Sequence, residues 1–492
     1  MRRKCTDSLI YWKKNPDRKP LILQGLRQTG KTWLLIDFGN KQYEHTLYIN
    51  LETDRAAADY LSIPHAPQEV LLFLETCAGK PLRPASSLLI LDNIQCIPQI
   101  STLLTSIALD FPQYHIASIY KGVVNSDSFS VHDFDILTLY PLDFEEFLWA
   151  NAEFALTREI RNHFSAFSPM GKKLHEKALS QFRLYLIIGG MPAAIMEYKK
   201  EKKLLLISDT QQKLLNLFLS DITALAPKGT ARHCRNAWLS IPAQLGKTSR
   251  KFQYTRIAKG ATAKVYHEPL QWLIRAGLAI PCQTAVCSKP SETSLHLYPV
   301  DTGLCSCILK IPAFQLLAGE ETTAGTACIE TFLAQHFIRN GYTLSYWSSG
   351  NQAEVPFLLS KNSHLIAIDY RTTPHQKCRN LMQLNKSSLS PAPTQMYLIS
   401  AEDFRQKRSL SDRACICGIL HIEHDSCNRQ KQTPAGSSSR FPIFGNREKN
   451  VFSHISLIWL RTFLRIVEDF FSPLSSAQEI ILNVSDTSFC RI

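Results

Sequence analysis

The sequence has 492 residues, more than one hydrophobic core usually serves, and 45% of them are hydrophobic. We therefore expect a globular chain of two to four domains and exclude a disordered one. Lysine and arginine total 55 against 42 acidic residues, which gives a formal net charge of +13. This charge fits anionic partners such as nucleotides or nucleic acid, and a solvated basic surface explains it equally well.

The 14 cysteines form no C-x-x-C pair of the kind found in zinc ribbons and redox sites. Reduced, mostly buried thiols are the favoured interpretation. The alternative is metal binding by one cluster of cysteine and histidine residues: Cys415, Cys417, His421, His424 and Cys427. The first seven residues include three basic ones but precede no apolar stretch, so we expect a cytoplasmic protein rather than a secreted one.

The first predicted elements surround a glycine-rich stretch. Residues 8–18 predict a short amphipathic helix that ends before Pro16. Residues 20–23 are typical of a buried parallel strand, and residues 33–38 have helical spacing. The stretch between them, GLRQTGKT, fits the phosphate-binding pattern G-x-x-x-x-G-K-[ST] at every fixed position. A chance glycine-rich turn is the weaker alternative, because strand, loop and helix come in the order that this motif needs.

In such a loop, backbone N–H groups and the helix N-terminus face phosphate oxygens. Lys31 would reach the β- and γ-phosphates of ATP, and Thr32 would place its hydroxyl on Mg²⁺. The predicted nucleotide-binding residues are Gly25, Leu26, Arg27, Gln28, Thr29, Gly30, Lys31, Thr32, Trp33 and Asp92.

Three further elements follow: a strand at 46–51, a helix at 68–78 and an apolar strand at 87–92. The last strand ends in Asp92, as in the Walker B pattern, whose carboxylate holds Mg²⁺ together with Thr32. A strand-ending turn residue is the alternative. Hydrolytic versions commonly have glutamate next, whereas this chain has Asn93. An amide holds a water molecule but cannot take its proton, so we predict that binding survives better than turnover.

Three stretches resemble one family: RKPLILQGLRQTGKTW at 18–33, LDNIQ at 91–95 and YPLDFEEFL at 140–148. They are similar to the prokaryotic AAA-type ATPases whose C-terminal half is an uncharacterised domain related to PD-(D/E)xK nucleases. The resemblance covers about residues 1–424 and also includes LYLIIGGMP at 184–192, SIPAQL at 240–245 and DTGL at 301–304.

The resemblance implies an α/β protein with several modules: an ATP-binding domain at 1–150, a helical lid at 151–227, a winged-helix module at 228–289 and a restriction-endonuclease-like α/β domain at 290–424. After residues 114–117 the family usually has a Gly-Ser pair that senses the γ-phosphate. This chain has Ser118 and Ile119 there. Together with Asn93, this is a second change on the hydrolytic side of the site.

Residues 143–225 have helical spacing, with a tight turn at Gly189 and Gly190. Residues 228–285 predict three helices followed by a strand, the order of a winged helix. Six basic residues are expected to line this module: Lys247, Arg250, Lys251, Arg256, Lys259 and Lys264. They fit phosphate contacts on DNA, and packing of the module against another domain remains the alternative.

The nuclease-like part lacks parts of the catalytic pattern that the resemblance implies. Glu330 is on a helical stretch where the family has its helical glutamate. Glu354 is followed by Pro356 where the pattern has aspartate, and Asp369 by Arg371 where it has lysine. Proline offers no metal ligand and arginine keeps its proton, so we predict no nuclease activity and interpret the three acids as remnants of the scaffold.

Residues 425–450 are polar and turn-rich, which is typical of a flexible linker, and the spacing within the tail 451–492 predicts an amphipathic helix. That helix is too charged for a membrane span, and docking on a partner and an unselected tail are both open. The sequence thus predicts a protein that uses Mg-ATP as a conformational ligand with weak or no hydrolysis. The alternatives are a DNA-binding regulator, a competent ATPase and a gene product that is losing its function. The oligomeric state is left open.

Overall fold

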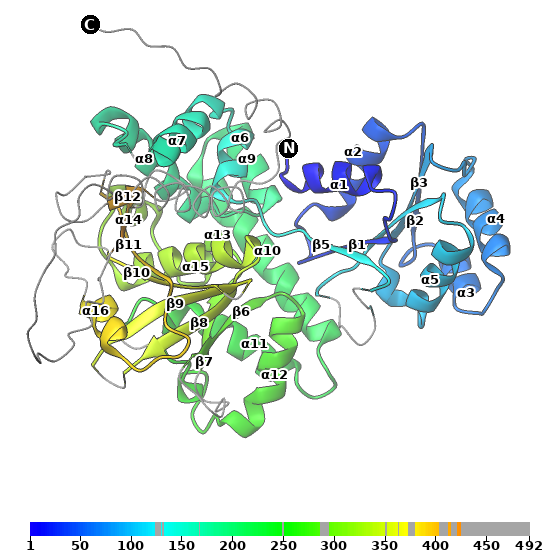
Figure 1. Ribbon diagram of the computed structural model, residues 1–492. Helices are drawn as coiled ribbons and strands as arrows, with labels where there is room; N and C mark the ends of the chain where they lie inside the picture. The colour runs from blue at the N-terminus through cyan, green and yellow to red at the C-terminus, as the bar shows by residue number, and fades with distance from the viewer. Residues whose placement is uncertain are drawn as a thin grey trace, which may run out of the picture.

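The chain folds into two lobes in the computed structural model (Figure 1). The N-terminal lobe is built on a five-stranded sheet, and the larger lobe combines many helices with an eight-stranded sheet. The structure describes residues 1–123, 129, 132–166, 168–247, 250–285, 295–349, 352–362, 364–371 and 379–402, and the backbone alone of 412–414 and 421–424.

All strand pairs of the five-stranded sheet are parallel, and its order is β2-β3-β4-β1-β5. The strands are β1 (Leu21–Gln24), β2 (His45–Asn50), β3 (Ser87–Asp92), β4 (His115–Ile119) and β5 (Asp135–Thr138). The helices of this lobe are α1 (Cys5–Lys14), α2 (Lys31–Gln42), α3 (Arg55–Leu61), α4 (Pro67–Ala78) and α5 (Ile100–Asp110), with a 3-10 turn η1 (Ile94–Cys96). The strands and helices predicted for this lobe are therefore confirmed, with shifts of up to four residues at their ends.

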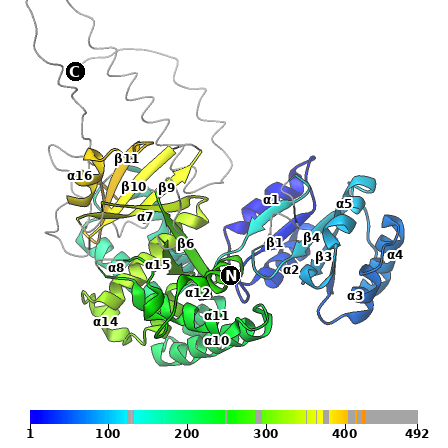
Figure 2. The same cartoon turned by 90° about the horizontal axis from the view of Figure 1, so that it is seen from below.

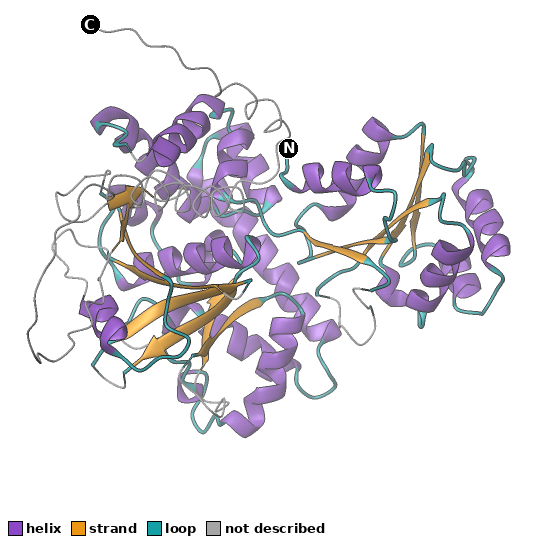
Figure 3. Cartoon of the chain, viewed as in Figure 1, coloured by secondary structure: helices purple, strands orange, loops and turns teal. Residues whose placement is uncertain are grey.

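Alternating strand residues place helices on both faces of this sheet (Figure 3). In β3, Leu88 and Ile90 pack in one cluster with α1 and α2, whereas Leu89 and Leu91 pack in another with α3, α4 and α5. Side chains along a strand point to opposite faces, so a continuously apolar strand suits a sheet that is covered on both sides. Because all strand pairs in this sheet are parallel, the carboxyl ends of the five strands lie at the same edge.

The next part of the chain is helical, as predicted. It contains α6 (Phe144–Ala150), α7 (Phe154–Ala166), α8 (Lys172–Ile188), α9 (Pro192–Glu201) and α10 (Leu204–Leu225). The predicted tight turn joins α8 to α9. A Cβ atom on Gly190 would lie 2.1 Å from the carbonyl oxygen of Leu142, which explains why glycine is needed there.

The eight-stranded sheet is mixed and has the order β12-β13-β11-β10-β9-β8-β6-β7. Its strands are β6 (Ala279–Thr284), β7 (Leu295–Pro299), β8 (Thr343–Ser348), β9 (Glu354–Lys361), β10 (His364–Tyr370), β11 (Gln395–Ser400), β12 (Asp412–Ala414) and β13 (His421–His424). The associated helices are α13 (Thr302–Ile308), α14 (Ala313–Ala318), α15 (Thr323–Arg339) and α16 (Arg379–Lys386). In β10, Ile366 and Ile368 belong to the apolar cluster of α15, whereas Ala367 belongs to that of α16. The sheet therefore lies between these two helices.

The prediction of three helices before a strand at 228–285 is wrong in its middle part. The structure has α11 (Ala231–Ser240), two 3-10 turns, η2 (Pro242–Gln244) and η3 (Tyr254–Arg256), and then α12 (Ala263–Arg275) and β6. Gly246 has a φ of +68°, and a Cβ there would lie 2.0 Å from the carbonyl oxygen of Thr323. This close approach to another helix leaves no room for a regular helix at Gly246. Strand β6 pairs with β7 and β8, so residues on both sides of position 290 share one sheet (Figure 2).

Several predictions fall outside the described side chains. They are the cluster Cys415, Cys417, His421, His424 and Cys427, the predicted linker at 425–450 and the predicted tail helix at 451–492. Within the described ranges, no helix combines the length and apolar character needed to cross a bilayer.

Candidate functional site

The glycine-rich loop connects the end of β1 to the start of α2, where the sequence predicts it. Gly25 has a φ of +139°, and a Cβ on it would lie 2.4 Å from the carbonyl oxygen of Leu139. Gln28 and Gly30 also have positive φ angles, of 66° and 92°. Only glycine adopts the backbone of position 25 at low cost, so the loop curls tightly in front of the helix N-terminus.

Lys31 is buried and lies against this loop. Its ammonium group donates to the carbonyl oxygens of Gly25 and Leu26 at 2.7 and 2.9 Å. Burial lowers the pKa of Lys31 to about 8, and the charge of Asp92 opposes that shift. The lysine therefore places a desolvated ammonium group inside the loop, a position suited to an anion that replaces the two carbonyl contacts.

Thr32 and Asp92 meet across the sheet edge. The Thr32 hydroxyl donates to Oδ2 of Asp92 at 2.7 Å, and the Tyr48 hydroxyl donates to the same oxygen at 2.9 Å. Among the described residues, the other oxygen of Asp92 is buried without a hydrogen-bond partner. A hydroxyl beside a carboxylate with a spare oxygen fits Mg²⁺, which uses few protein ligands and completes its shell with phosphates and water. The described residues contain no cluster of three metal-ligating side chains, and such a site does not require one.

The other predicted loop residues differ in exposure. Leu26 and Thr29 are buried, Gln28 is exposed, and the side chain of Trp33 is 50% exposed at the start of α2. Arg27 forms an ion pair with Asp221 of α10. The pair connects the loop to the helical part of the chain, a contact that sequence reasoning did not predict.

Asn93 is held in place by an interaction that the sequence did not reveal. Its backbone is left-handed, with a φ of 64°, and its side chain is buried. The side-chain amide donates to Oδ1 of Asn50 at 2.7 Å. Asn50 ends β2 opposite Asp92 in the parallel register, so the strand pairing places the two amides together. The position after Asp92 therefore carries a neutral group that is already hydrogen-bonded.

The expected sensing position also differs from the family pattern. Ser118 lies within β4, fully buried, and its hydroxyl has no partner among the described residues. At the edge of the sheet the chain instead presents Lys121, whose ammonium group lies 2.6 Å from Oε2 of Glu52. The following Gly122 exchanges two backbone hydrogen bonds with Gly25, at 2.8 and 3.0 Å. In the sequence, only the position of this lysine two residues after a central strand pointed to it.

A second set of predicted residues converges in the larger lobe. Glu330 of α15 and Glu354 of β9 both contact Arg250, with Oε1 of each carboxylate 2.5 and 2.8 Å from Nε and Nη1 respectively. Nη2 of Arg250 also donates to the Tyr370 hydroxyl at 2.9 Å. Arg250 was predicted to line a DNA surface, and this is wrong because its guanidinium group is turned inward onto the buried Glu330 and the partly buried Glu354.

Asp369 lies apart from this arginine contact. Its carboxylate accepts from the backbone N–H of Tyr370 at 2.9 Å and from the side chain of Asn380 at 3.1 Å. Burial raises the pKa of Asp369 to about 6. Arg371, at the position of the expected lysine, forms an ion pair with Glu402 at 3.0 Å.

Comparisons with known proteins support the first of these two sites. Residues 17–148 match the family described as AAA domain, and residues 179–315 match a domain of unknown function (DUF8612). No curated protein matches the sequence.

Solved structures give weak likenesses at 12–13% identity. The ORC1 protein of Aeropyrum pernix, solved in complex with DNA, has a TM-score of 0.27 over 65% of this chain and 91% of its own. A signal transduction ATPase with a tetratricopeptide repeat sensor from Pyrococcus horikoshii has a TM-score of 0.26 over 68% and 48%. DnaA of Aquifex aeolicus, bound to AMPPCP, has a TM-score of 0.22 over 54% and 85%. The family match and the loop geometry together show that residues 17–148 contain a P-loop domain of the AAA type.

Proposed function

We propose that this protein binds ATP with Mg²⁺ and uses the nucleotide as a conformational ligand, with weak or no hydrolysis. The observation that carries the proposal is an asymmetry within one site. The binding side is complete, with the curled loop, Lys31 and the contact between Thr32 and Asp92. On the hydrolytic side, Asn93 stands where a general base would be needed and is bonded to Asn50.

Each side-chain role in this proposal follows from its contacts. Lys31 exchanges its two carbonyl acceptors for β- and γ-phosphate oxygens, which are stronger acceptors because they are charged. Thr32 and Asp92 would hold Mg²⁺, and the metal would supply positive charge that neutralises the phosphates. Asn93 can orient a water molecule, but it cannot remove a proton from it, and positioned bases contribute about 10²–10⁴-fold to such reactions.

The test measures ATP affinity and phosphate release on the full chain, with Lys31→Ala and Asp92→Asn beside it. We expect the unmodified protein to bind ATP in the presence of Mg²⁺, with turnover near background, and Lys31→Ala to lose binding. Absence of ATP affinity would refute the proposal. Brisk hydrolysis that disappears in Lys31→Ala would instead identify a competent ATPase and refute the weak-turnover part.

The larger lobe is proposed to contain an inactive nuclease-like domain at 290–424. Support comes from the contacts of the acids that metal catalysis would need. Glu330 and Glu354 already share the positive charge of Arg250, and Pro356 offers no ligand. This proposal keeps the module boundaries expected from the sequence, which are 1–150, 151–227, 228–289 and 290–424.

A second candidate function is DNA binding through the region 228–289. Lys251, Arg256, Lys259 and Lys264 are exposed and Lys247 is half-buried, which leaves five of the six predicted basic residues available. If all five contacted phosphates, the logarithm of DNA affinity would fall with the logarithm of salt concentration with a slope of about −4.5. Titration of duplex DNA at several salt concentrations tests this, with Lys259→Gln/Lys264→Gln as the variant expected to reduce the slope by about 2. A flat profile would remove this candidate.

A further inference from the structure

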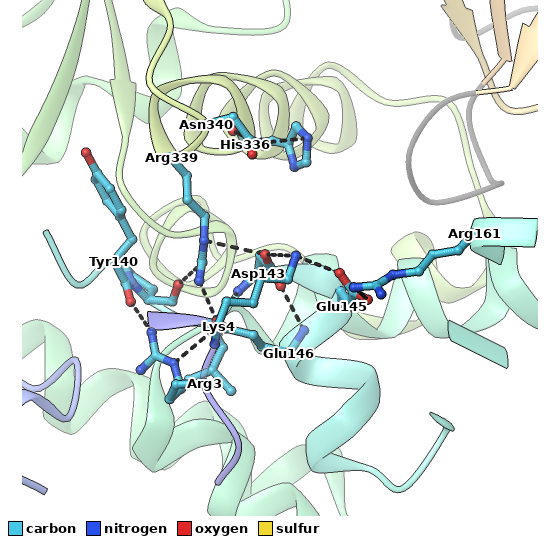
Figure 4. Close-up of polar contacts among 12 residues, drawn as sticks. Arg3, Lys4, Tyr140, Asp143, Glu145, Glu146, Arg161, His336, Arg339 and Asn340 are labelled. Atoms are coloured by element: carbon cyan, nitrogen blue, oxygen red, sulfur yellow. Dashed lines mark hydrogen bonds and ion pairs between the residues drawn. The ribbon is translucent and has the colours of Figure 1, made fainter. Parts of the chain in front are cut away.

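The stretch YPLDFEEFL at 140–148 has no role in the site described above, although the sequence singles it out. In the structure it forms the centre of a largely buried group of charges, shown in Figure 4, in which Lys4 and Arg161 are partly exposed. We call this group the ionic cluster, and its members are Arg3, Lys4, Asp143, Glu145, Glu146, Arg161 and Arg339. These residues come from the N-terminal segment, α6, α7 and α15.

Glu146 connects two arginines that are far apart in sequence. Its Oε1 lies 3.2 Å from Nε of Arg3, and its Oε2 accepts from Nη2 of Arg339 at 2.5 Å. The side chain of Glu146 is fully buried, and the two positive charges keep its pKa below the usual range despite that burial. Because Glu146 also forms a capping box with Asp143 at the start of α6, its carboxylate has a fixed position.

Arg3 also contacts the phosphate loop. Its Nη1 donates to the carbonyl oxygen of Thr29 at 2.9 Å, and its Nη2 donates to that of Tyr140 at 2.6 Å. Thr29 is the loop residue between Gln28 and Gly30, both of which have positive φ angles. In a planar trans peptide the C=O and N–H groups point in opposite directions. By fixing the carbonyl of Thr29, Arg3 therefore also fixes the direction of the Gly30 N–H.

Arg339 ties the same group to the larger lobe. It is the last residue of α15, and it donates to the carbonyl oxygen of Pro141 at 2.6 Å in addition to Glu146. Beside the cluster, a pocket of about 220 Å³ lies between the loop residues Gly25 and Leu26 and Ile338 of α15. Leu26 belongs to the same apolar cluster as several residues of α15, so the charged contacts act in addition to apolar packing between the loop and this helix.

We propose that Arg3 and Arg339 are positioning residues for the phosphate loop, so that nucleotide affinity depends on α15 of the larger lobe. The path runs from Arg339 through Glu146 and Arg3 to the carbonyl of Thr29. In this proposal both arginines act through the backbone of the loop. The proposal rests on the proposed ATP site and specifies which residues outside the loop keep that site in its binding shape. Since coupling between sites is reciprocal, nucleotide binding must also alter the stability of α15.

The same helix reaches the second group of charges, because Glu330 of α15 contacts Arg250. Nucleotide occupancy of the loop is thereby connected, through one helix, to the sheet of the larger lobe. In this proposal, α15 is the element whose conformation responds to bound nucleotide.

The experiment measures two quantities on the full chain: ATP and ADP affinity, and backbone hydrogen exchange in residues 25–31 and 323–339. The variants are Arg3→Met and Arg339→Met. Arg371→Met is the matched control, because Arg371 is, like Arg339, a largely shielded arginine of the larger lobe, and it pairs with Glu402 rather than with the cluster. We expect both test variants to lose affinity on the order of tenfold, as is typical of coupled sites, and to exchange faster in residues 25–31 without nucleotide. The control should match the unmodified chain in both quantities.

Conservative variants separate positioning from a merely structural role. Arg3→Lys and Arg339→Lys keep the charge but lack the planar fork, so they should retain folding and lose part of the affinity. If the methionine variants do not fold, the lysine variants are compared with the unmodified chain instead. Nucleotide should slow exchange in α15 of the unmodified chain, and this effect should be absent in Arg3→Met.

The outcomes distinguish this inference from the proposed function. If the unmodified chain binds ATP, Lys31→Ala does not, and Arg339→Met binds like the unmodified chain with unchanged exchange in the loop, the inference is wrong and the ATP site stands. If the unmodified chain binds no ATP, the proposed function fails. In that case the exchange of residues 25–31 without nucleotide still decides whether Arg3 and Arg339 hold the loop.

Discussion

The guanidinium group of Arg250 lies 2.5 Å from the carboxylate of Glu330, a residue 80 positions later in the chain. The side chain of Glu330 is fully buried, and Arg250 is also largely shielded from water. A charge in such a place needs a partner, and this arginine supplies it.

Replacing Arg250 by methionine should therefore destabilise the protein strongly. Removal of one partner of a buried ion pair typically costs about 3–5 kcal/mol, because the other charge is left uncompensated. Denaturant unfolding measures this cost. Arg256→Met is the matched control, since Arg256 is an exposed arginine six positions away. A cost no larger than that of Arg256→Met would contradict the prediction. Adding Glu330→Gln to Arg250→Met should recover part of the loss.

The nuclease-like domain should leave DNA and RNA uncut with either Mg²⁺ or Mn²⁺. We expect Pro356→Asp, Arg371→Lys and the double variant to remain inactive as well, because Arg250 still binds both Glu330 and Glu354. A cleavage assay with titrated metal checks all four proteins. Metal-dependent cutting by the unmodified chain, lost in Asp369→Ala, would show that a working site uses other ligands.

The variant Asn93→Glu should raise ATP turnover, because it supplies a carboxylate beside Asp92. A positioned base contributes about 10²–10⁴-fold. The variant should also lose about 1–3 kcal/mol of unfolding free energy, since glutamate tolerates a φ of 64° poorly and the bond to Asn50 is lost. Phosphate release and denaturant unfolding provide the two measurements.

Asn93→Gln is the control for this prediction, because it has the length of glutamate without the charge. Turnover of Asn93→Glu that does not exceed that of Asn93→Gln would show that a base at this position is not the missing component.

Asp369 should give the stability of the protein a specific pH dependence. Burial raises the pKa of its carboxyl from 3.8 to about 6, so the folded state holds the proton more tightly than the unfolded state. The stabilisation from this proton is complete below about pH 4 and is lost as the pH rises through 6. Relative to Asp369→Asn, which does not titrate, the unmodified chain should lose on the order of 2–3 kcal/mol over this window. Denaturant unfolding at pH 4 to 7 measures it, and a constant difference between the two proteins would contradict the assignment.

Much of the N-terminal site followed from local sequence. The order of strand, glycine-rich loop and helix placed residues 25–32, and an apolar run ending in an acid placed Asp92, because both patterns are determined by neighbouring residues. Two of the helices predicted within 228–285 are only 3-10 turns in the structure, and the close approach of Gly246 to Thr323 between these turns depends on a distant part of the chain. For the same reason, the inward turn of Arg250 had no signal in a sequence where a row of basic residues indicates a surface.

The sequence by itself determined the phosphate loop, the carboxylate opposite Thr32 and the absence of glutamate after Asp92, because each is a residue type at a fixed spacing. Only the tertiary structure decided that Asn93 is bonded to Asn50, that Arg250 neutralises two acids, and that Arg3 and Arg339 meet at Glu146. These contacts join residues from 43 to 193 positions apart. Hydrogen bonds and ion pairs act over a few ångströms, so such contacts exist only once strand pairing and helix packing have brought the groups together.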